Sequence, residues 1–189
     1  MSSIRLMFPA AAGLLLAACS STPTPPPAPP VAVSVVSTAQ MAEANLSPAS
    51  ASIVSGRLAL VPEAGGVHVT GVIGGLRPLQ QPAFHVHQRG DCSAVDASSA
   101  GDHFNPTQQP HGAPGTGPHH LGDMPNLRAD AQGRANVDIH LRGVTLGGGA
   151  ANDIAGRALI VHAQSDDHRS QPAGNAGARI ACGLIRVTR

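Results

Sequence analysis

Hydrophobic and polar positions alternate with a period of two over most of the chain beyond residue 40, and clusters of Gly and Pro interrupt the alternation. Val67 and Val69, for example, alternate with His68 and Thr70. Such alternation is typical of a strand with one buried face, and no helical period persists over a long window. The pattern predicts strands over residues 57–61, 67–72, 83–87, 126–131, 135–141, 159–163 and 179–187, with a hairpin turn at Gln132-Gly133.

Short strands at this spacing, bounded by turn residues, predict an all-β fold, either an antiparallel sandwich or a barrel. Aromatic residues make up only 2% of the chain, so the core must be built from Val, Leu, Ile and Ala. Two stretches, about 90–125 and about 163–178, lack the strand pattern and are rich in His, Asp, Gly and Pro. Loops of this length are usually functional, so these two are the candidate functional segments.

The first 19 residues have the pattern of an export signal. Arg5 precedes an uncharged apolar run over residues 6–16, which is too short for a mature membrane-spanning helix. Residues 16–19 (LAAC) are similar to a bacterial lipobox, in which Cys19 is lipid-modified and becomes the new N-terminus. An ordinary secretory signal with a chance Cys is the alternative.

The segment after Cys19 is Pro-rich and uncharged over residues 20–32, which predicts an extended tether. We therefore expect a lipoprotein signal peptide at 1–18, the lipidated Cys and its tether at 19–40, and one β domain at 41–189. Ser20 after the Cys is similar to lipoproteins that are sorted to the outer membrane. The expected location is the bacterial cell envelope, facing the periplasm, with the N-terminal lipid as the membrane anchor.

Two cysteines remain once Cys19 is assigned to the lipid. Cys92 and Cys182 form an even pair in an exported chain, and the oxidising compartment predicts one disulfide between them. A pair of metal-binding thiolates is the alternative, and the absence of any CxxC motif disfavours it.

Charge and composition exclude nucleic acid as a partner. The formal net charge is +1 with neutral His, so the chain has no strong basic field. Trp and Tyr are absent, which removes the usual platforms for base stacking. The chain nevertheless has 10 His, and this excess in a chain of low charge suggests metal binding.

The histidines are spaced as metal ligands. His85 and His87 lie two apart on a predicted strand, so their side chains share one face and can hold one ion, for which an imidazole-rich site suits copper. Three imidazoles and one carboxylate on the first long loop make a complete tetrahedral set for a structural zinc, which would organise that loop. This second set is His103, His111, His120 and Asp123.

These motifs, in their order along the chain, resemble the copper-zinc superoxide dismutases over about residues 45–185. The matching segments are residues 85–87 (HVH), 90–93 (GDCS), 103–106 (HFNP), 111–112 (HG), 120–123 (HLGD), 161–163 (VHA) and 174–183 (GNAGARIACG). The resemblance implies an immunoglobulin-like Greek-key β-sandwich or barrel of about eight strands. It also implies a long metal-binding loop and an electrostatic loop.

The resemblance implies one copper and one zinc per chain, with His103 shared between them as a bridging imidazolate. The copper ligands would be His85, His87, His103 and His162. The zinc ligands would be His103, His111, His120 and Asp123. Cys92 and Cys182 would be the disulfide partners, and Asp166 would hydrogen-bond one ligand of each metal, His85 and His111, and so fix their rings.

The implied activity is the dismutation of superoxide to dioxygen and hydrogen peroxide, which would protect the cell envelope from oxidants. Arg179 would face the copper and attract the superoxide anion, so Arg179 and His103 are the expected catalytic residues. Asp102 is a departure, because relatives often have a small or cyclic residue directly before the bridging His. A carboxylate at this position would weaken the attraction of an anion.

The other four histidines need no special role in this interpretation. His68 and His140 are expected to face solvent, and His168 to be exposed on the second loop. His120 is preferred over His119 as the ligand because only His120 is followed by Gly-Asp at the right distance. The scarcity of aromatic residues favours a monomer over a homodimer.

Two other functions remain open. The extra histidines suggest a non-enzymatic periplasmic copper- and zinc-binding lipoprotein on the same scaffold. A surface interaction module that has lost its copper is the third hypothesis, which the complete ligand set disfavours.

Overall fold

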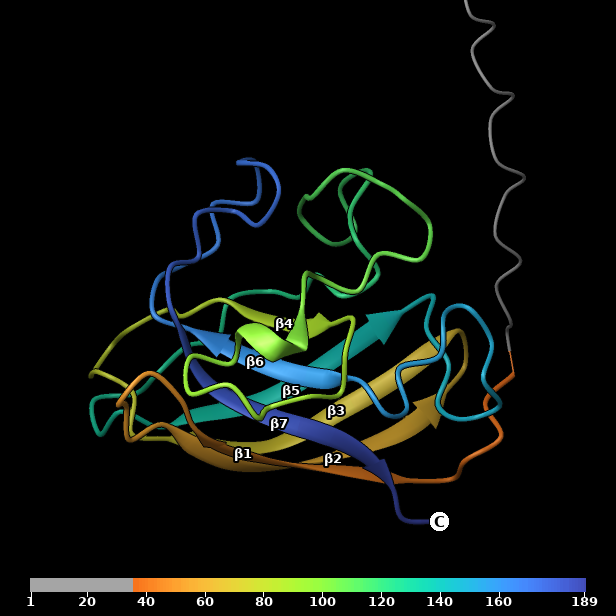
Figure 1. Ribbon diagram of the computed structural model, residues 1–189, viewed down its shortest axis with the longest axis horizontal. Coiled ribbons are helices and arrows are strands. Elements are labelled where there is room, and N and C mark those ends of the chain that lie inside the picture. The colour runs from red at the N-terminus through yellow and green to blue at the C-terminus, as the bar shows by residue number, and fades with distance from the viewer. Residues whose placement is uncertain (1–35) are drawn as a thin grey trace, which may run out of the picture.

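The protein is shown in Figure 1 as a computed structural model, which describes residues 36–189. The expected signal peptide, Cys19 and most of the expected tether lie outside the described residues. The described chain forms seven β-strands and one short 3₁₀ helix, η1. In chain order these are β1 (Ala42–Pro48), β2 (Ser55–Glu63), β3 (Gly66–Gly74), β4 (Phe84–His87), η1 (Ser98–Ala100), β5 (Ala135–Arg142), β6 (Ala158–His162) and β7 (Arg179–Val187).

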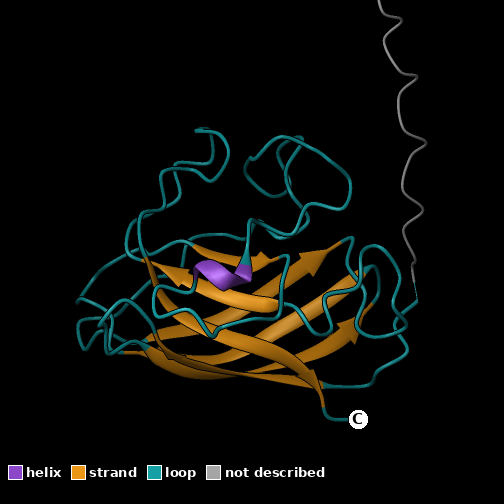
Figure 2. Ribbon diagram, in the orientation of Figure 1, coloured by secondary structure: helices purple, strands orange, loops and turns teal. Residues whose placement is uncertain are grey.

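All seven strands belong to one curled antiparallel sheet, in the order β4-β6-β7-β1-β2-β3-β5 (Figure 2). The first strand, β1, pairs with both β2 and the last strand, β7. The predicted all-β fold is confirmed, with seven strands in the described chain rather than about eight. No helix in residues 36–189 has both the length and the apolar character needed to cross a membrane.

The alternating pattern places one set of side chains inside the curled sheet. In β5, Ala135, Val137 and Leu141 are buried, whereas Asn136 and Asp138 are exposed. The enclosed core is almost entirely aliphatic, as the composition requires, and Phe84 and Phe104 supply its aromatic rings. β4 and β6 are buried along their whole length because loops cover their outer face.

The structure differs from the predicted strands at two places. β1 was not among the predicted strands, and it is a regular strand whose Ala42, Ala44 and Leu46 are buried. The stretch 126–131 was predicted as a strand and contains only an isolated bridge, between Ala129 and Ala135. The side chain of Asp130 accepts hydrogen bonds from the backbone N–H groups of residues 132 and 134. These bonds hold a turn, so the chain leaves the sheet before a regular β-ladder can form.

Two long connections, residues 88–134 and 163–178, lie side by side next to β4 and β6 (Figure 1). They are joined directly, because the backbone N–H of His111 donates to Oε1 of Gln171 and Nε2 of Gln171 donates to the carbonyl of His111, both at 2.9 Å. The Cys92–Cys182 disulfide ties the first connection to β7 and confirms the predicted pairing. A link across 90 residues of sequence stabilises the fold by about 4–5 kcal/mol through chain entropy.

Candidate metal centre

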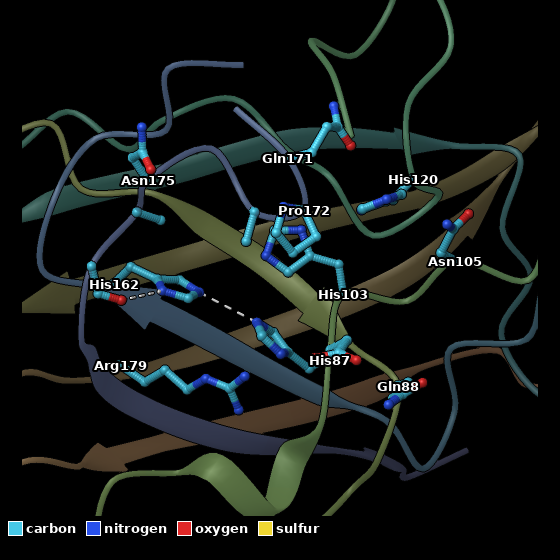
Figure 3. Close-up of a pocket in the computed structure, with 14 residues that line it drawn as sticks. His87, Gln88, His103, Asn105, His120, His162, Gln171, Pro172, Asn175 and Arg179 are labelled. Atoms are coloured by element: carbon cyan, nitrogen blue, oxygen red, sulfur yellow. Dashed lines mark hydrogen bonds between the residues drawn. The ribbon is translucent and has the colours of Figure 1, made fainter. Parts of the chain in front are cut away.

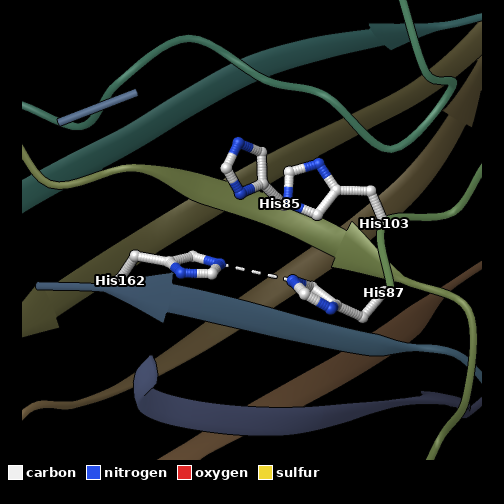
Figure 4. Close-up of side chains that lie close together, drawn as sticks. All are labelled: His85, His87, His103 and His162. Atoms are coloured by element: carbon white, nitrogen blue, oxygen red, sulfur yellow. Dashed lines mark hydrogen bonds between the residues drawn. The ribbon is translucent and has the colours of Figure 1, made fainter. Parts of the chain in front are cut away.

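Four histidines from three elements surround one point beside β4 (Figure 4). His85 and His87 lie on β4, His162 ends β6, and His103 follows η1 and bridges to His87. The β4–β6 ladder brings the ends of these strands together, and a register shift between Val161 and His162 turns the last residue of β6 out of the regular pairing. One ring nitrogen of each histidine lies within 4.8 Å of the others.

The inward nitrogens of these four rings have no hydrogen-bond partner outside the group. Nδ1 of His85 and Nε2 of His103 are buried and have no hydrogen-bond partner, and Nε2 of His87 lies 3.3 Å from Nε2 of His162. The outward nitrogens of two of these rings have backbone acceptors. Nδ1 of His87 donates to the carbonyl oxygen of Gly101 at 2.8 Å, and Nδ1 of His162 donates to the carbonyl oxygen of Gly177 at 3.3 Å. A neutral imidazole has one N–H, so an outward N–H leaves a lone pair directed inward.

A second group gathers around Asp123, whose side chain is fully buried. Its Oδ1 lies 2.8 Å from Nδ1 of His103 and 3.3 Å from Nδ1 of His120, and its Oδ2 lies 3.0 Å from Nδ1 of His111. The backbone N–H of His120 also donates to Oδ2 at 2.8 Å. Nδ1 of His111 and of His120 is buried without a hydrogen bond of good geometry.

His103 belongs to both groups. Its Nδ1 faces Asp123, while its Nε2 faces the first group, and its ring centroid lies 3.9 Å from that of His85. The two groups therefore share one imidazole, which can bind two cations at once only if it carries no proton.

Asp166 connects the two groups from outside. Its Oδ2 accepts from Nε2 of His85 and its Oδ1 accepts from Nε2 of His111, both at 2.8 Å. Asn126 holds the backbone of Asp166 through two hydrogen bonds, one in each direction. A single buried carboxylate thus orients one ring of each group and leaves the Nδ1 atoms of both rings directed inward.

Electrostatics keep most of these groups in the form that binds cations. Burial lowers the pKa of His85 to about 4 and that of His162 to about 3, and it holds the pKa of His87 well below its usual value, so these rings are neutral at pH 7. Burial opposes ionisation of Asp123, but its close contacts with His103, His111 and His120 outweigh burial and hold the pKa of Asp123 well below its usual range.

His111 behaves differently from the other rings. Burial lowers its pKa, but the close contacts with the carboxylates of Asp123 and Asp166 outweigh burial and raise the pKa to about 9. A cation that binds Nδ1 of His111 must therefore displace a proton.

A cavity of about 540 Å³ opens next to the first group (Figure 3). Its lining includes His87, His103 and His162 together with Arg179. The guanidinium is held in place, because Nη1 donates to the carbonyl of Ala97 at 2.7 Å and Nη2 to that of Gly101 at 2.6 Å. Among the described residues that line the cavity, Arg179 is the only arginine and Asp102 the only carboxylate.

Comparison with known proteins agrees with this geometry. The family model described as copper/zinc superoxide dismutase matches residues 54–185. The chain belongs to the copper/zinc superoxide dismutase family. A superoxide dismutase [Cu-Zn] 2 of Aquifex aeolicus is 42% identical over 136 residues, which cover 70% of this chain and 80% of that protein.

Other proteins that the chain matches carry different names. The superoxide dismutase-like protein YojM of Bacillus subtilis is 40% identical over 58% of each chain. A solved SOD-like protein from Bacillus subtilis has a TM-score of 0.69 at 33% identity, covering 76% of this chain and 97% of that one. The clock protein EA4 has a TM-score of 0.71 at 35% identity, covering 81% of this chain and 98% of that one.

Membership in the copper/zinc superoxide dismutase family implies copper and zinc, and the donor atoms fit both ions. Four imidazole nitrogens suit copper, whereas three imidazoles and one carboxylate suit zinc. The buried ring nitrogens without partners in the two groups are the structural sign that cations belong there.

Every expected site residue in the described chain lies in or beside this centre, apart from the two disulfide cysteines. His119 does not join it, since its Nδ1 points at the carbonyl of Gly117. His168 was expected to be exposed, but it is partly buried and lies beside the metal centre. Its Nδ1 is 3.4 Å from Oδ2 of Asp166. Sequence reasoning missed the carbonyls of Gly101 and Gly177, and a backbone acceptor leaves no signal in a sequence.

Gly174 gives a test of how Asp166 supports the zinc-side group. Its φ is +63°, and a Cβ atom there would lie 1.8 Å from Oδ1 of Asp166 and 2.7 Å from Nε2 of His111. We expect Gly174→Ala to push the carboxylate away and to weaken zinc binding by about 10–100-fold. Competition with a chromophoric chelator, starting from metal-free protein, measures the affinity.

Gly149→Ala is the matched control for this substitution. Gly149 has a similar φ of +71°, but no heavy atom lies within 4 Å of its Cβ position, so it introduces backbone strain without a clash. Equal zinc affinity in the two variants would contradict the supporting role of Asp166.

Proposed function

We propose that the chain is a copper/zinc superoxide dismutase that converts two superoxide anions and two protons into dioxygen and hydrogen peroxide. Copper would be held by His85, His87, His103 and His162. Zinc would be held by His103, His111, His120 and Asp123. The observation that carries the proposal is the complete double ligand set, joined through His103 and open to a cavity that contains Arg179.

The completeness of the ligand set matters because some relatives are named only superoxide dismutase-like. When bound, copper supplies the one-electron redox change, and zinc supplies a fixed positive charge without redox chemistry. The protein's own contribution is to fix the donor atoms, to place a proton carrier and to admit the anion.

His103 is the proposed proton carrier. Its Nδ1 is directed at Asp123 and the zinc-side group, so only Nε2 is available to take up and release a proton next to the cavity. A proton held at Nε2 lies where the peroxide product needs one, and the second proton comes from solvent. General acid–base groups in such positions contribute roughly 10²–10⁴-fold to rate.

Arg179 is the proposed anion guide. Its guanidinium is fixed by two backbone carbonyls, and the carbonyl of Gly101 also accepts from His87. The positive charge is therefore positioned relative to a copper ligand before the anion arrives. A fixed charge in a cavity raises the local concentration of an oppositely charged substrate.

The open cavity supports catalysis over simple metal storage. A storage site is expected to enclose its copper away from small anions. In this protein three of the four proposed copper ligands, His87, His103 and His162, line the open cavity.

Dismutase activity of the copper- and zinc-loaded protein tests the proposal directly, and His103→Ala tests the proton role. We expect the variant to lose at least about 100-fold in rate because it removes the proposed proton carrier next to the cavity. The assay is the inhibition of cytochrome c reduction by superoxide. His140→Ala, on the outer face of β5, is the control and should keep full activity.

Two outcomes would count against these roles. A correctly metallated, disulfide-bonded protein without dismutase activity would overturn the proposed function. His103→Ala with retained copper and a full rate would exclude the proton role alone.

Substitutions of Arg179 and Asp102 should change kcat/KM in opposite directions. We expect Arg179→Gln to lower kcat/KM by roughly tenfold at low ionic strength and Asp102→Asn to raise it, because one removes attraction and the other removes repulsion. Stopped-flow measurements at several salt concentrations should show both effects shrinking as salt screens the charges. Equal kcat/KM in the three proteins would show that local charge does not guide the anion.

We further propose that the domain at 41–189 is exported as a lipoprotein through Cys19 and protects the cell envelope. The support is the pattern of residues 1–32, which comprises an apolar run, the LAAC sequence and a Pro-rich stretch. In a bacterial host we expect the full chain in the membrane fraction and Cys19→Ser in the soluble periplasmic fraction. Cell fractionation with immunoblotting distinguishes them, and an unchanged distribution would refute lipidation at Cys19.

A further inference from the structure

A second cluster of histidines lies on the outer face of β3 and β5. These strands pair so that His68 stands directly opposite His140, and Asp138 stands opposite Thr70 on the same face. Val67, Val69 and Leu141, their neighbours along the strands, are buried, so His68 and His140 point away from the core. The two imidazole rings stack with centroids 4.3 Å apart and an interplanar angle of 8°.

Two carboxylates hold these rings. Oδ1 of Asp138 lies 2.6 Å from Nε2 of His68, and Oε2 of Glu63 lies 2.8 Å from Nδ1 of His140. The hydrogen bond from His68 holds the pKa of Asp138 below its usual value, so this carboxylate is ionised at neutral pH. One ligand atom each from His68, Asp138 and His140 lies within 4.8 Å of the other two.

We propose that His68, His140 and Asp138 form a third metal site, which binds a divalent transition ion such as zinc with water completing its coordination. Two imidazole nitrogens and one carboxylate oxygen are the donors that zinc prefers, and three protein ligands with an open position make a common zinc arrangement. The donors come from two paired strands, so the backbone already brings them together, and one ring must tilt out of the stack for both lone pairs to reach one ion.

Glu63 is a positioning residue of this site. Its contact with Nδ1 of His140 directs Nε2 of that ring outward as the donor atom, which is how carboxylates orient metal-binding histidines. Arg142 lies next to Glu63, with Nη1 3.8 Å from Oε1. The cluster therefore contains both the ligands and a group that fixes one of them.

The proposed site is independent of the copper and zinc centre, since the two share no residue. The exposed fractions of its side chains are 33% for His68, 51% for His140 and 77% for Asp138, whereas the ligands of the centre are buried. Asp138 and His140 also line a groove of about 450 Å³, which leaves room for water on the ion. Water competes for such an ion, so the site should bind more weakly than the centre and exchange its ion with solvent.

The competing explanation is a pair of histidine–carboxylate contacts on the surface without an ion. A zinc titration of protein whose centre already holds copper and zinc separates the two explanations. We expect one further zinc per chain by calorimetry and elemental analysis. His68→Ala and His140→Ala should each weaken this third binding event by at least about tenfold, and Glu63→Gln by about tenfold.

Asn136→Ala is the matched control, because Asn136 lies on the same face of β5 and outside the cluster. It should leave the third binding event unchanged. Nuclear magnetic resonance of the ring protons of His68 and His140 should show both rings shifting with the third equivalent of zinc. No third zinc on the wild-type chain, or a third zinc bound equally well by the His68→Ala/His140→Ala double variant, would overturn the proposal.

The test of the third metal site gives an outcome that does not depend on whether the chain is a dismutase. Dismutase activity should be the same in the wild-type chain and in all the variants of the outer cluster. A chain without activity that still binds the third ion through His68 and His140 would refute the proposed function and support this site.

Discussion

The structure depends on one constraint: buried imidazoles must be held so that lone pairs, rather than N–H groups, converge on two points. A neutral imidazole has one N–H, so the protein selects the inward atom by giving the outward nitrogen an acceptor. Gly101 and Gly177 provide carbonyls for His87 and His162, and Asp166 provides one oxygen each for His85 and His111. Without these acceptors the rings could rotate or change tautomer, and the two donor sets would be lost.

This constraint explains why the long connections are tied to the sheet so firmly. The acceptors for the rings on β4 and β6 come from the loops, so a loop that moved away would release the ligands as well. The disulfide anchors one loop to β7, and Gln171 joins that loop to the other through His111. Fold and centre are therefore coupled: burial keeps the rings of His85 and His162 neutral, and the loops that bury these rings also orient them.

The sequence was sufficient for the parts of the molecule that depend on local pattern or spacing. Alternation predicted six of the seven strands, and the spacing of histidines predicted that His85 and His87 share a face. The place of His162 beside them came only from the family resemblance. The alternating pattern missed β1, because the small side chains of Ala42 and Ala44 weaken the hydrophobic signal. It also predicted a strand at residues 126–131, where the turn at Asp130 ends the pairing. The contact between His68 and His140 could not be predicted because it depends on the register of β3 with β5, which alternation alone leaves open.

The two histidine clusters show how burial decides what the same residue types can do. Around His103, exclusion of water removes the competing ligand and lowers the pKa values of His85 and His87, so their lone pairs are available for ions that stay bound. On the outer face of β3 and β5, carboxylates hold the rings in a similar way, but solvent reaches Asp138 and His140. The carboxylate–imidazole contacts thus set the direction of the donor atoms in both clusters, whereas the depth of burial sets how strongly water competes for the ion. A chain of near-zero net charge can in this way keep one deeply held centre and one exchangeable site, because each depends on local geometry rather than on the field of the whole protein.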